Sequence, residues 1–358
     1  MCAELRRASR LVGANPRGPV ARVSLAVRGC LRGLGASPGD SVVVALSGGA
    51  DSLALAAAAI DSGTRMGLDV RTVTVDHGLR PDSGHEARAV AELARSLGAV
   101  PRVVGVDAAA GADGPEGNAR AARMEALRRE AAGSPVLLGH TMDDQAETVL
   151  LRLARGSGAG SLRAMSPRRA DPDGTVWLRP LLGVRRADTA GACAQMGLVP
   201  RSDPTNDPDG PWRAADGSAL RRAAVRHRAL PALARALGAD PVPALARSAA
   251  AAADDDEALA SWAQRVRASE TRGQRGARSI RVKALEGLPR AVRGRVLASF
   301  LRDAGVPGGS LAAGHVEAVD ALVTAWRGQG PLSLPRVVVA RSGRGERAVI
   351  EAGPLRSQ

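Results

Sequence analysis

Short apolar runs alternate with longer stretches of helical periodicity through the first part of the chain. The apolar runs are Val42–Leu46, Val70–Val75, Val100–Val106 and Val136–Leu138, and alanine-rich segments between them favour helices. A helix is also predicted over 20–34, before Gly-Ala-Ser-Pro-Gly-Asp ends it. Strands and helices that alternate in this way form an α/β fold with a doubly wound parallel sheet, whose ligands bind at the carboxyl ends of the strands.

The pattern changes near residue 240, beyond which helical periodicity continues alone up to a β-rich tail. Residues 335–353 hold two β-rich runs around Ser-Gly-Arg-Gly, which is typical of a hairpin. We therefore expect a basic lead-in over 1–18 and a Rossmann-like nucleotide domain over 19–236. A smaller, mainly helical domain with a C-terminal β-hairpin is expected over 237–358.

Composition adds a strong positive charge but few aromatic residues. The formal charge of +14 and the pI of about 11.4 favour a polyanionic partner. Lys283 is the only lysine, Phe300 is the only phenylalanine, and tyrosine is absent. This bias toward alanine, glycine, arginine and proline also fits nucleotide composition, so the charge alone leaves nucleic-acid binding open.

Cysteine use and hydropathy favour a cytoplasmic location. Cys2, Cys30 and Cys193 are widely spaced without a Cys-x-x-Cys pair, which argues against disulfides and against a cysteine-rich zinc site. No apolar run approaches the roughly 18 residues of a membrane helix. The first residues also lack the apolar core of a secretory signal. We therefore expect a reducing compartment and no membrane partner.

The turn after the first predicted strand has the composition of a phosphate-binding loop. It consists of Ser47, Gly48, Gly49, Ala50, Asp51 and Ser52. A glycine-rich turn that opens a helix directs backbone N–H groups and the helix dipole at one place, which favours phosphate. Asp51 would repel phosphate unless a cation lies between them, so it implies Mg²⁺. A Walker loop and a dinucleotide fingerprint are both missing at this turn.

The end of the fourth predicted strand carries the densest polar signal. Asp143 can cap the following helix, whereas Asp144 and Glu147 are three apart and share one helical face. Two carboxylates there, opposite the phosphate loop, suit Mg²⁺ or a substrate ammonium. An acidic first turn favoured by the helix dipole is the alternative, but it leaves the neighbouring His140 unexplained.

Other polar side chains fall near the same edge of the predicted sheet. Asp76 and His77 follow the second strand, where they either cap it or line a nucleotide or substrate pocket. Arginines that share helical faces could hold an RNA backbone. They are Arg120, Arg123, Arg152 and Arg155.

Several longer motifs make a family resemblance specific. VDHGLR, GHTMDDQAETVLLRLARGSG, RPLLGVRRAD and GLVPRSDPTND are followed by VRHRALPAL. In this order they resemble the tRNA(Ile)-lysidine synthetases, members of the pyrophosphatase-loop (PP-loop) ATP enzymes. The match runs from about residue 20 to the end and is strongest over 41–231. AVDALVTAWRGQGPLSLP is similar to the helical substrate-binding domain of short bacterial forms.

The resemblance implies an ATP-dependent ligase of L-lysine and tRNA. The C2 oxygen of the wobble cytidine in a CAU-anticodon isoleucine tRNA would attack the α-phosphate of ATP. The ε-amine of free lysine would then displace AMP to give lysidine. A homodimer stays open.

The resemblance also assigns residues by matching motif positions. Residues 47–52 would bind ATP, with Asp51 on Mg²⁺. The remaining assignments are His140, Asp144 and Glu147 as the catalytic wall that receives cytidine and lysine, Asp76, His77, Asp143 and Arg179 around the substrates, and Arg226 and His227 on tRNA. Met124, Ala223 and Ala224 depart from the family pattern outside the ATP loop, which puts RNA contacts in doubt.

One rival function comes from the same superfamily and another from a different class of protein. A tRNA thiolase of the same superfamily needs reactive cysteines, and Cys193 stands alone beyond the nucleotide domain. A catalytically silent RNA-binding relative would keep the fold, but the intact phosphate loop and the Asp144–Glu147 pair argue against it. Asparagine, GMP and NAD synthetases share the loop, but the sequence shows no amidotransferase domain of the kind expected in such enzymes.

Overall fold

The chain forms two units that meet within one helix. The computed structural model describes residues 7–78, 82–107, 114–156, 159–201, 207, 209–210, 213, 217–274 and 277–354. Contacts divide the chain between Ala251 and Ala252, inside helix α11 (Val242–Glu270) and later than the expected boundary at 236/237. In the described part of the chain, no helix combines the length and the apolar character needed to cross a membrane.

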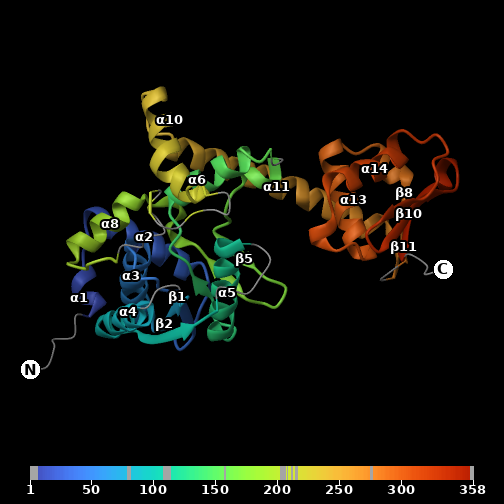
Figure 1. The fold of residues 1–358 in the computed structure, drawn as a ribbon. Helices are drawn as coiled ribbons and strands as arrows, with labels where there is room; N and C mark the ends of the chain where they lie inside the picture. Colours follow the sequence, from blue (N-terminus) through green and yellow to red (C-terminus); the bar gives the residue numbers. More distant parts are fainter. Residues whose placement is uncertain are drawn as a thin grey trace, which may run out of the picture. The chain divides into compact units, whose positions relative to one another are not determined.

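A six-stranded sheet in the order β3-β2-β1-β4-β6-β5 forms the centre of the N-terminal unit (Figure 1). Its strands are β1 (Ser41–Ala45), β2 (Asp69–Asp76), β3 (Val100–Gly105), β4 (Val136–Leu137), β5 (Arg168–Ala170) and β6 (Val176–Leu178). Every neighbouring pair is parallel except β5 with β6, and Val43 of β1 pairs with Arg71 on one side and Val136 on the other. The predicted doubly wound α/β sheet is confirmed.

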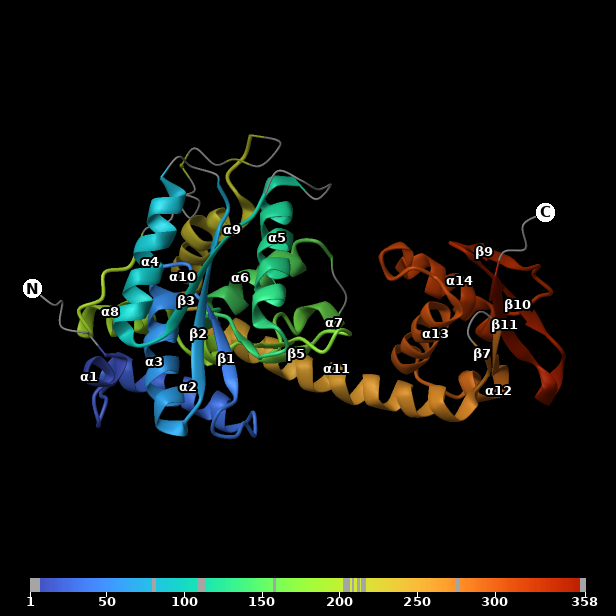
Figure 2. The same ribbon diagram turned by 90° about the horizontal axis from the view of Figure 1, so that it is seen from below.

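Helices cover both faces of this sheet (Figure 2). The described helices of this unit are α1 (Ala8–Val12), α2 (Gly18–Arg32), α3 (Ala50–Met66), α4 (Ser83–Leu97), α5 (Gly114–Ala131), α6 (Met142–Leu153), α7 (Ala159–Leu162), the 3₁₀ helix η1 (Pro180–Gly183), α8 (Arg186–Gln195), α9 (Arg221–Ala224), the π-helical turn η3 (Val225–Ala229) and α10 (Leu230–Leu237). Helices α2, α3, α4 and α8 share the core of one face, and α5 packs on the other.

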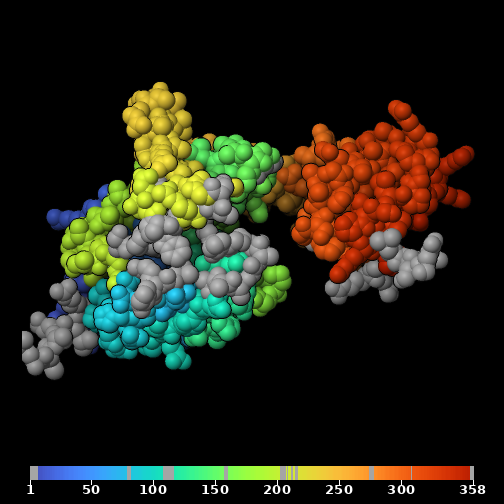
Figure 3. Space-filling view, viewed as in Figure 1, coloured from blue at the N-terminus to red at the C-terminus, as the bar shows by residue number. Residues whose placement is uncertain are grey.

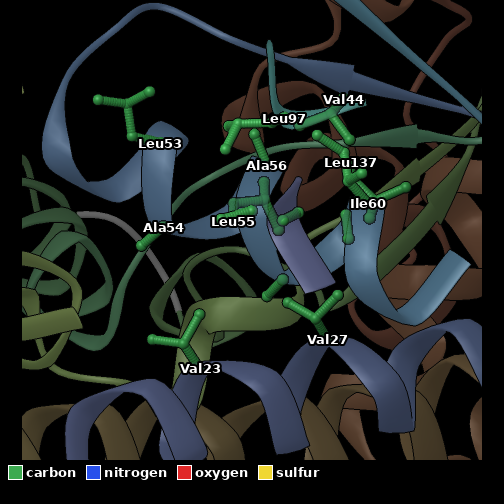
Figure 4. Packing of buried hydrophobic residues seen from close by; sticks show 14 of the residues in the cluster. Val23, Val27, Val44, Leu53, Ala54, Leu55, Ala56, Ile60, Leu97 and Leu137 are labelled. Carbon is green, nitrogen blue, oxygen red and sulfur yellow. The ribbon is translucent and has the colours of Figure 1, made fainter. Parts of the chain in front are cut away.

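The alternation of side chains along β1 builds a core on each face. Val42 and Val44 join the larger core with α2 and α3, whereas Val43 points into the core under α5. Figure 4 shows Val44 near Leu97 of α4 and Leu137 of β4, whereas Val23 and Val27 of α2 belong to the same core on the other side of α3. Small side chains along α3, buried from Leu53 to Ile60, let this helix lie close to the sheet.

The strand order places the candidate site at a topological switch point. From β1 the chain adds β2 and then β3 on one side, and afterwards places β4 and β6 on the other. The turns after β1 and β4 therefore leave neighbouring strands in opposite directions, which is where open α/β sheets bind ligands. The phosphate-loop sequence and the acidic motif lie in these two turns.

Helices stand near both ends of the N-terminal unit. Ala8 and Val12 of α1 are buried in the main core, so part of the expected lead-in over 1–18 is a packed helix, while residues 1–6 lie outside the described ranges. At the other end α10 projects from the surface of the unit (Figure 3). Leu237 at its tip is 63% exposed.

The C-terminal unit combines helices with more β-structure than the sequence pattern predicts. Its elements are β7 (Thr271–Gln274), β8 (Ala277–Arg281), α12 (Val282–Glu286), α13 (Arg290–Ala304), the 3₁₀ turn η4 (Gly308–Ser310), α14 (Ala313–Thr324), β9 (Leu332–Leu334), β10 (Val337–Ser342), the 3₁₀ turn η5 (Gly345–Arg347) and β11 (Val349–Pro354). The predicted hairpin is β10–β11, with Ser342 opposite Val349. It belongs to a five-stranded antiparallel sheet in the order β7-β8-β11-β10-β9, and helices α13 and α14 share its core around Phe300.

A close approach of α3 to β2 depends on Gly63. A Cβ atom there would lie 2.3 Å from Val70 Cγ2. We expect Gly63→Ala to lower the free energy of unfolding by about 1–3 kcal/mol, because the overpacking outweighs the better helix propensity of alanine. Gly29→Ala in α2, where nothing lies within 4 Å of the added Cβ, is the control and should be neutral or stabilising. Urea unfolding measures both, and equal stabilities would contradict the prediction.

Candidate active site

The turn after β1 has the backbone geometry of an anion cradle. Gly48 has a φ of 87°, and a Cβ atom on it would lie 2.7 Å from Val90 Cγ2, so a side chain is excluded there. Gly49 is the N-cap of α3 and no side chain caps this helix end. Ser52 Oγ accepts a hydrogen bond from the Ser47 N–H at 3.2 Å and donates to the Gly49 carbonyl at 3.0 Å. The first N–H groups of α3 therefore face a turn that is rigid and uncapped, which suits a phosphate.

Contacts from two other segments fix this loop. The Arg201 N–H donates to the Gly48 carbonyl at 2.9 Å, and the Arg201 guanidinium bonds the Glu86 carbonyl at 2.9 Å. On the other side, a Cβ atom on Gly139 would lie 3.2 Å from the backbone of Asp51 and Ser52. The turn after β4 thus touches the start of α3.

Asp51 lies where the two turns meet. The Thr189 hydroxyl of α8 donates to its Oδ1 atom, and Arg186 Nε lies 3.6 Å from its Oδ2 atom. Burial raises the pKa of Asp51, although the Thr189 hydrogen bond and the Arg186 charge oppose the rise. A half-buried carboxylate at a phosphate cradle is stabilised in its ionised form by a nearby cation.

The residues present fit a Mg²⁺ ion that arrives with a nucleotide. Among the described residues no cluster of three or more His, Cys, Asp or Glu side chains could hold a metal by itself. Mg²⁺ commonly binds one or two carboxylates together with substrate phosphates. Asp51, directly beside the uncapped end of α3, matches that mode.

The start of α6 confirms an acidic face but changes its cap. Thr141, not Asp143, is the N-cap: its N–H and its hydroxyl donate to Asp144 Oδ2 at 2.7 and 2.9 Å. The prediction that Asp143 caps this helix is wrong, because its carboxylate accepts from the Arg186 N–H and from Arg185. Asp144 and Glu147 face one place, and Glu147 is completely buried.

Arginines fill that place. Arg186 Nη2 lies 2.9 Å from Asp144 Oδ1 and 3.1 Å from Glu147 Oε1. Arg226 Nε donates to Glu147 Oε1 at 2.8 Å, and Arg222 Nε lies 3.5 Å from Glu147 Oε2. Burial raises the pKa of Asp144, but the Arg186 charge and the Thr141 hydrogen bond outweigh it and the net pKa is lowered.

Sequence reasoning missed Arg186, Arg222 and Thr189. The motif RPLLGVRRAD offers two adjacent arginines, and nothing in the sequence says which of them turns inward. Arg226, expected on tRNA, contacts the buried carboxylates instead.

Cationic groups gather beside the carboxylates, around His140. Burial lowers the pKa of His140 to about 3; Asp144 opposes this fall, whereas Arg179 and Arg123 add to it. Burial is also the largest cause that lowers the pKa values of Arg123 and Arg179, each to about 10, and Arg120 contributes to both. The Nδ1 atom of His140 and the Nε atom of Arg179 are buried without a hydrogen-bond partner. This side of the site suits an incoming anion.

The remaining predicted residues lie around this centre or away from it. Asp76 Oδ1 accepts from the Gly78 N–H at 3.0 Å, and His77 is half-buried beside it at the end of β2. Arg152 donates to the Ala164 carbonyl at 2.9 Å and so holds a loop. Three of the predicted tRNA-binding side chains are exposed, namely Arg120, Arg155 and His227.

Comparisons with known proteins show the family of the chain. A family model described as a PP-loop domain matches residues 27–233, and one described as the TilS substrate binding domain matches residues 281–345. The tRNA(Ile)-lysidine synthase of Thermobifida fusca is 48% identical over 334 residues, which cover 92% of this chain and 96% of that protein. The chain belongs to the tRNA(Ile)-lysidine synthase family. The synthase of Streptomyces coelicolor is 45% identical over 316 residues, with 87% and 85% covered.

A solved structure supports the fold of the first unit. The U34-tRNA thiolase NcsA of Methanococcus maripaludis, solved with its [4Fe-4S] cluster, aligns with a TM-score of 0.52 at 16% identity. The alignment covers 66% of this chain and 79% of the thiolase. Together with the matched PP-loop domain it confirms the nucleotide-binding fold, and the chain is an enzyme that uses ATP and acts on tRNA.

The contact at Gly139 should affect the binding of ATP more than it affects the free energy of unfolding. We expect Gly139→Ala to raise the KM for ATP roughly ten- to a hundredfold, because the added methyl pushes the backbone of Asp51 out of place. Gly105→Ala, at the end of β3 with nothing within 4 Å of its Cβ, is the matched control. Steady-state AMP release at varied ATP measures both, and a Gly139 variant with the ATP KM of the parent would contradict the prediction.

His140 should stay neutral in the folded protein far below the pH at which a free histidine titrates. Its pKa is about 3 in the fold and 6.5 in the unfolded chain, so below pH 6.5 the unfolded state binds the extra proton and stability falls as the pH falls. NMR of ring-labelled histidines, with His140→Asn for assignment, should show no protonation of His140 from pH 7 to about pH 5. A midpoint above pH 5 would disprove this.

Proposed function

We propose that this enzyme joins L-lysine to the wobble cytidine of a CAU-anticodon isoleucine tRNA in two steps at one site. First the C2 oxygen of the cytidine attacks the α-phosphorus of ATP, an O–P bond forms and pyrophosphate leaves. Then the lysine ε-amine attacks C2, a C–N bond forms, the C2–O bond breaks to release AMP, and the amine loses a proton. The approach of Gly139 to the phosphate loop carries this proposal, because it joins an ATP loop to a carboxylate pair.

The first step uses the cradle and the cationic side of the site. The uncapped start of α3 would bind the phosphates of ATP, and a Mg²⁺ ion held by Asp51 would offset their charge. Arg123, Arg179 and His140 lie together on the other side of the site. There they would stabilise the negative charge of the reacting phosphate and of pyrophosphate. Electrostatic stabilisation of such charge is commonly the largest contribution to group transfer.

The second step needs a neutral amine, since a protonated lysine has no lone pair to attack with. Asp144 and Glu147 would receive the amine, but Arg186 and Arg226 already contact both carboxylates. A lysine ammonium beside these paired carboxylates is stabilised less than it would be beside unpaired ones. The arrangement therefore lets the amine give up its proton while it stays within reach of polar acceptors.

Transfer RNA would contact the exposed side chains of Arg120, Arg155 and His227. The unit that matches the substrate binding domain would hold another part of the tRNA. The departures Ala223 and Ala224 lie in α9, beside Arg222, so they alter the surroundings of the carboxylate pair as well as the surface.

Thiolase chemistry is the nearest rival, and the described cysteines disfavour it. Burial raises the pKa of Cys193 to about 11, and burial likewise raises the pKa of Cys30. A thiol with a raised pKa is a poor nucleophile at neutral pH. Cys193 Sγ also donates to the Ala50 carbonyl at 3.4 Å, which is a packing role behind the loop.

The decisive experiment measures AMP release from ATP with and without CAU-anticodon isoleucine tRNA and L-lysine, followed by nucleoside analysis of the tRNA. Lysidine that forms only when all three substrates are present would support the proposal. AMP release with another nucleophile, or sulfur incorporation into tRNA, would overturn the substrate assignment and leave only the ATP chemistry.

Substitutions should separate the two steps. We expect Asp51→Asn to reduce tRNA-dependent pyrophosphate exchange by about a hundredfold or more, because the cation on the phosphates loses its ligand. Glu147→Gln should retain that exchange and impair lysidine formation. Isotope exchange without lysine reports the first step, and labelled lysine incorporation reports the second. If Glu147→Gln forms lysidine with the parent rate and lysine KM, the assigned pocket is wrong.

A further inference from the structure

One guanidinium connects the two halves of the site. Arg186, near the N-terminus of α8, lies against Asp51 at 3.6 Å, Asp144 at 2.9 Å and Glu147 at 3.1 Å. Asp51 belongs to the start of α3, and the other two carboxylates belong to α6. Arg186 is therefore the described side chain that touches both the ATP loop and the substrate wall.

The carboxylates in the wall take their orientation from these bonds. Asp144 Oδ2 accepts two hydrogen bonds from Thr141, and its Oδ1 atom accepts from Arg186 and Arg226. Glu147 Oε1 likewise receives Arg186 and Arg226. A carboxylate has about four acceptor sites, so Asp144 has nearly its full complement. Removing Arg186 would leave one acceptor site open on each carboxylate and let both side chains turn.

The contact with Asp51 differs from the other two. Its 3.6 Å separation is longer than a hydrogen bond, and the Arg186 Nε atom is buried without an acceptor. Arg186 thus forms close ion pairs with Asp144 and Glu147, whereas only a longer electrostatic attraction links it to Asp51. Arg186 would keep its bonds to Asp144 and Glu147 if Asp51 held a Mg²⁺ ion.

We propose that Arg186 is a positioning residue for the lysine step, which holds Asp144 and Glu147 in the orientation that selects the amine while its loose contact leaves Asp51 free for the nucleotide. This inference rests on the proposed function. Arg186 acts through the carboxylates and needs no contact with a substrate. Its substitution should therefore separate the two half-reactions.

Arg185 supplies a matched control at the adjacent position. It also carries a guanidinium and also pairs with two carboxylates, Asp143 at 3.2 Å and Asp240. Asp143 also accepts from the Arg186 N–H, but the bonds of Arg185 go to Asp143 and Asp240 and not to Asp144 or Glu147. Arg185→Gln thus removes a comparable ion-pair cluster from the start of α8 and leaves the direct bonds to Asp144 and Glu147 in place.

The test compares Arg186→Gln and Arg185→Gln in the full chain. For Arg186→Gln we expect a lysine KM raised about tenfold or more, from the loss of hydrogen bonds to charged groups, with tRNA-dependent pyrophosphate exchange within about threefold of the parent. Binding of labelled lysine, in the presence of tRNA and a non-hydrolysable ATP analogue, should weaken in parallel. Arg186→Lys should recover part of the affinity, because an ammonium restores the charge but cannot fork between two carboxylates. Arg185→Gln should leave the lysine KM within about threefold of the parent.

A double-mutant cycle separates positioning from a general structural role. If Arg186 acts through Asp144 and Glu147, Arg186→Gln should raise the lysine KM less in the Glu147→Gln background than in the parent, whereas Glu147→Gln/Arg185→Gln should show additive effects. Additive effects for Arg186, an equal loss of both half-reactions, or an unchanged lysine KM would each overturn the inference. Failure of the parent enzyme to make lysidine would instead overturn the proposed function, so the two failures are distinguishable.

Discussion

The buried charge of Glu147 is the constraint around which this site is organised. Its side chain has no exposed surface, and an isolated ionised carboxylate in such a place costs far more than a fold can sustain. The charge is matched by Arg186 from α8, Arg226 from η3 and Arg222 from α9. One carboxylate on α6 thereby joins two segments that are distant in the sequence, namely α8 and the consecutive turns α9 and η3. Breaking such a pair is costly because the charge that remains stays buried.

This network also divides the site into two electrostatic halves. On one side the carboxylates are balanced by arginines, so the local field favours a neutral nucleophile. On the other side burial lowers the pKa of Arg123, Arg179 and His140, and the charges of both arginines add to the fall at His140. Partly desolvated cations of this kind gain interaction energy when an anion arrives. A reaction that adds phosphate charge first and an amine second needs this division.

The sequence predicts the nucleotide domain better than it predicts the site. Strand and helix periodicities are local, so β1 to β4 and the helices between them follow from the pattern of apolar residues. β5 is short and polar, and β6 is an apolar run of only three residues, too short to indicate a strand by itself. The strands β7 and β8 are largely polar and were not predicted either. The phosphate loop was predictable because glycine, serine and aspartate between a strand and a helix have few other uses.

The partners of the carboxylates could not be predicted, because they depend on helical phase and on tertiary contacts. Arg185 and Arg186 are adjacent and chemically identical, yet α8 begins so that one faces the exposed Asp240 and the other the buried pair. Arg226 has the sequence context of an RNA contact but lies on the inner side of η3. An arginine that the sequence assigns to RNA can therefore instead neutralise a buried carboxylate of the protein. The deciding observation is whether a buried carboxylate lies within its reach, and Glu147 does.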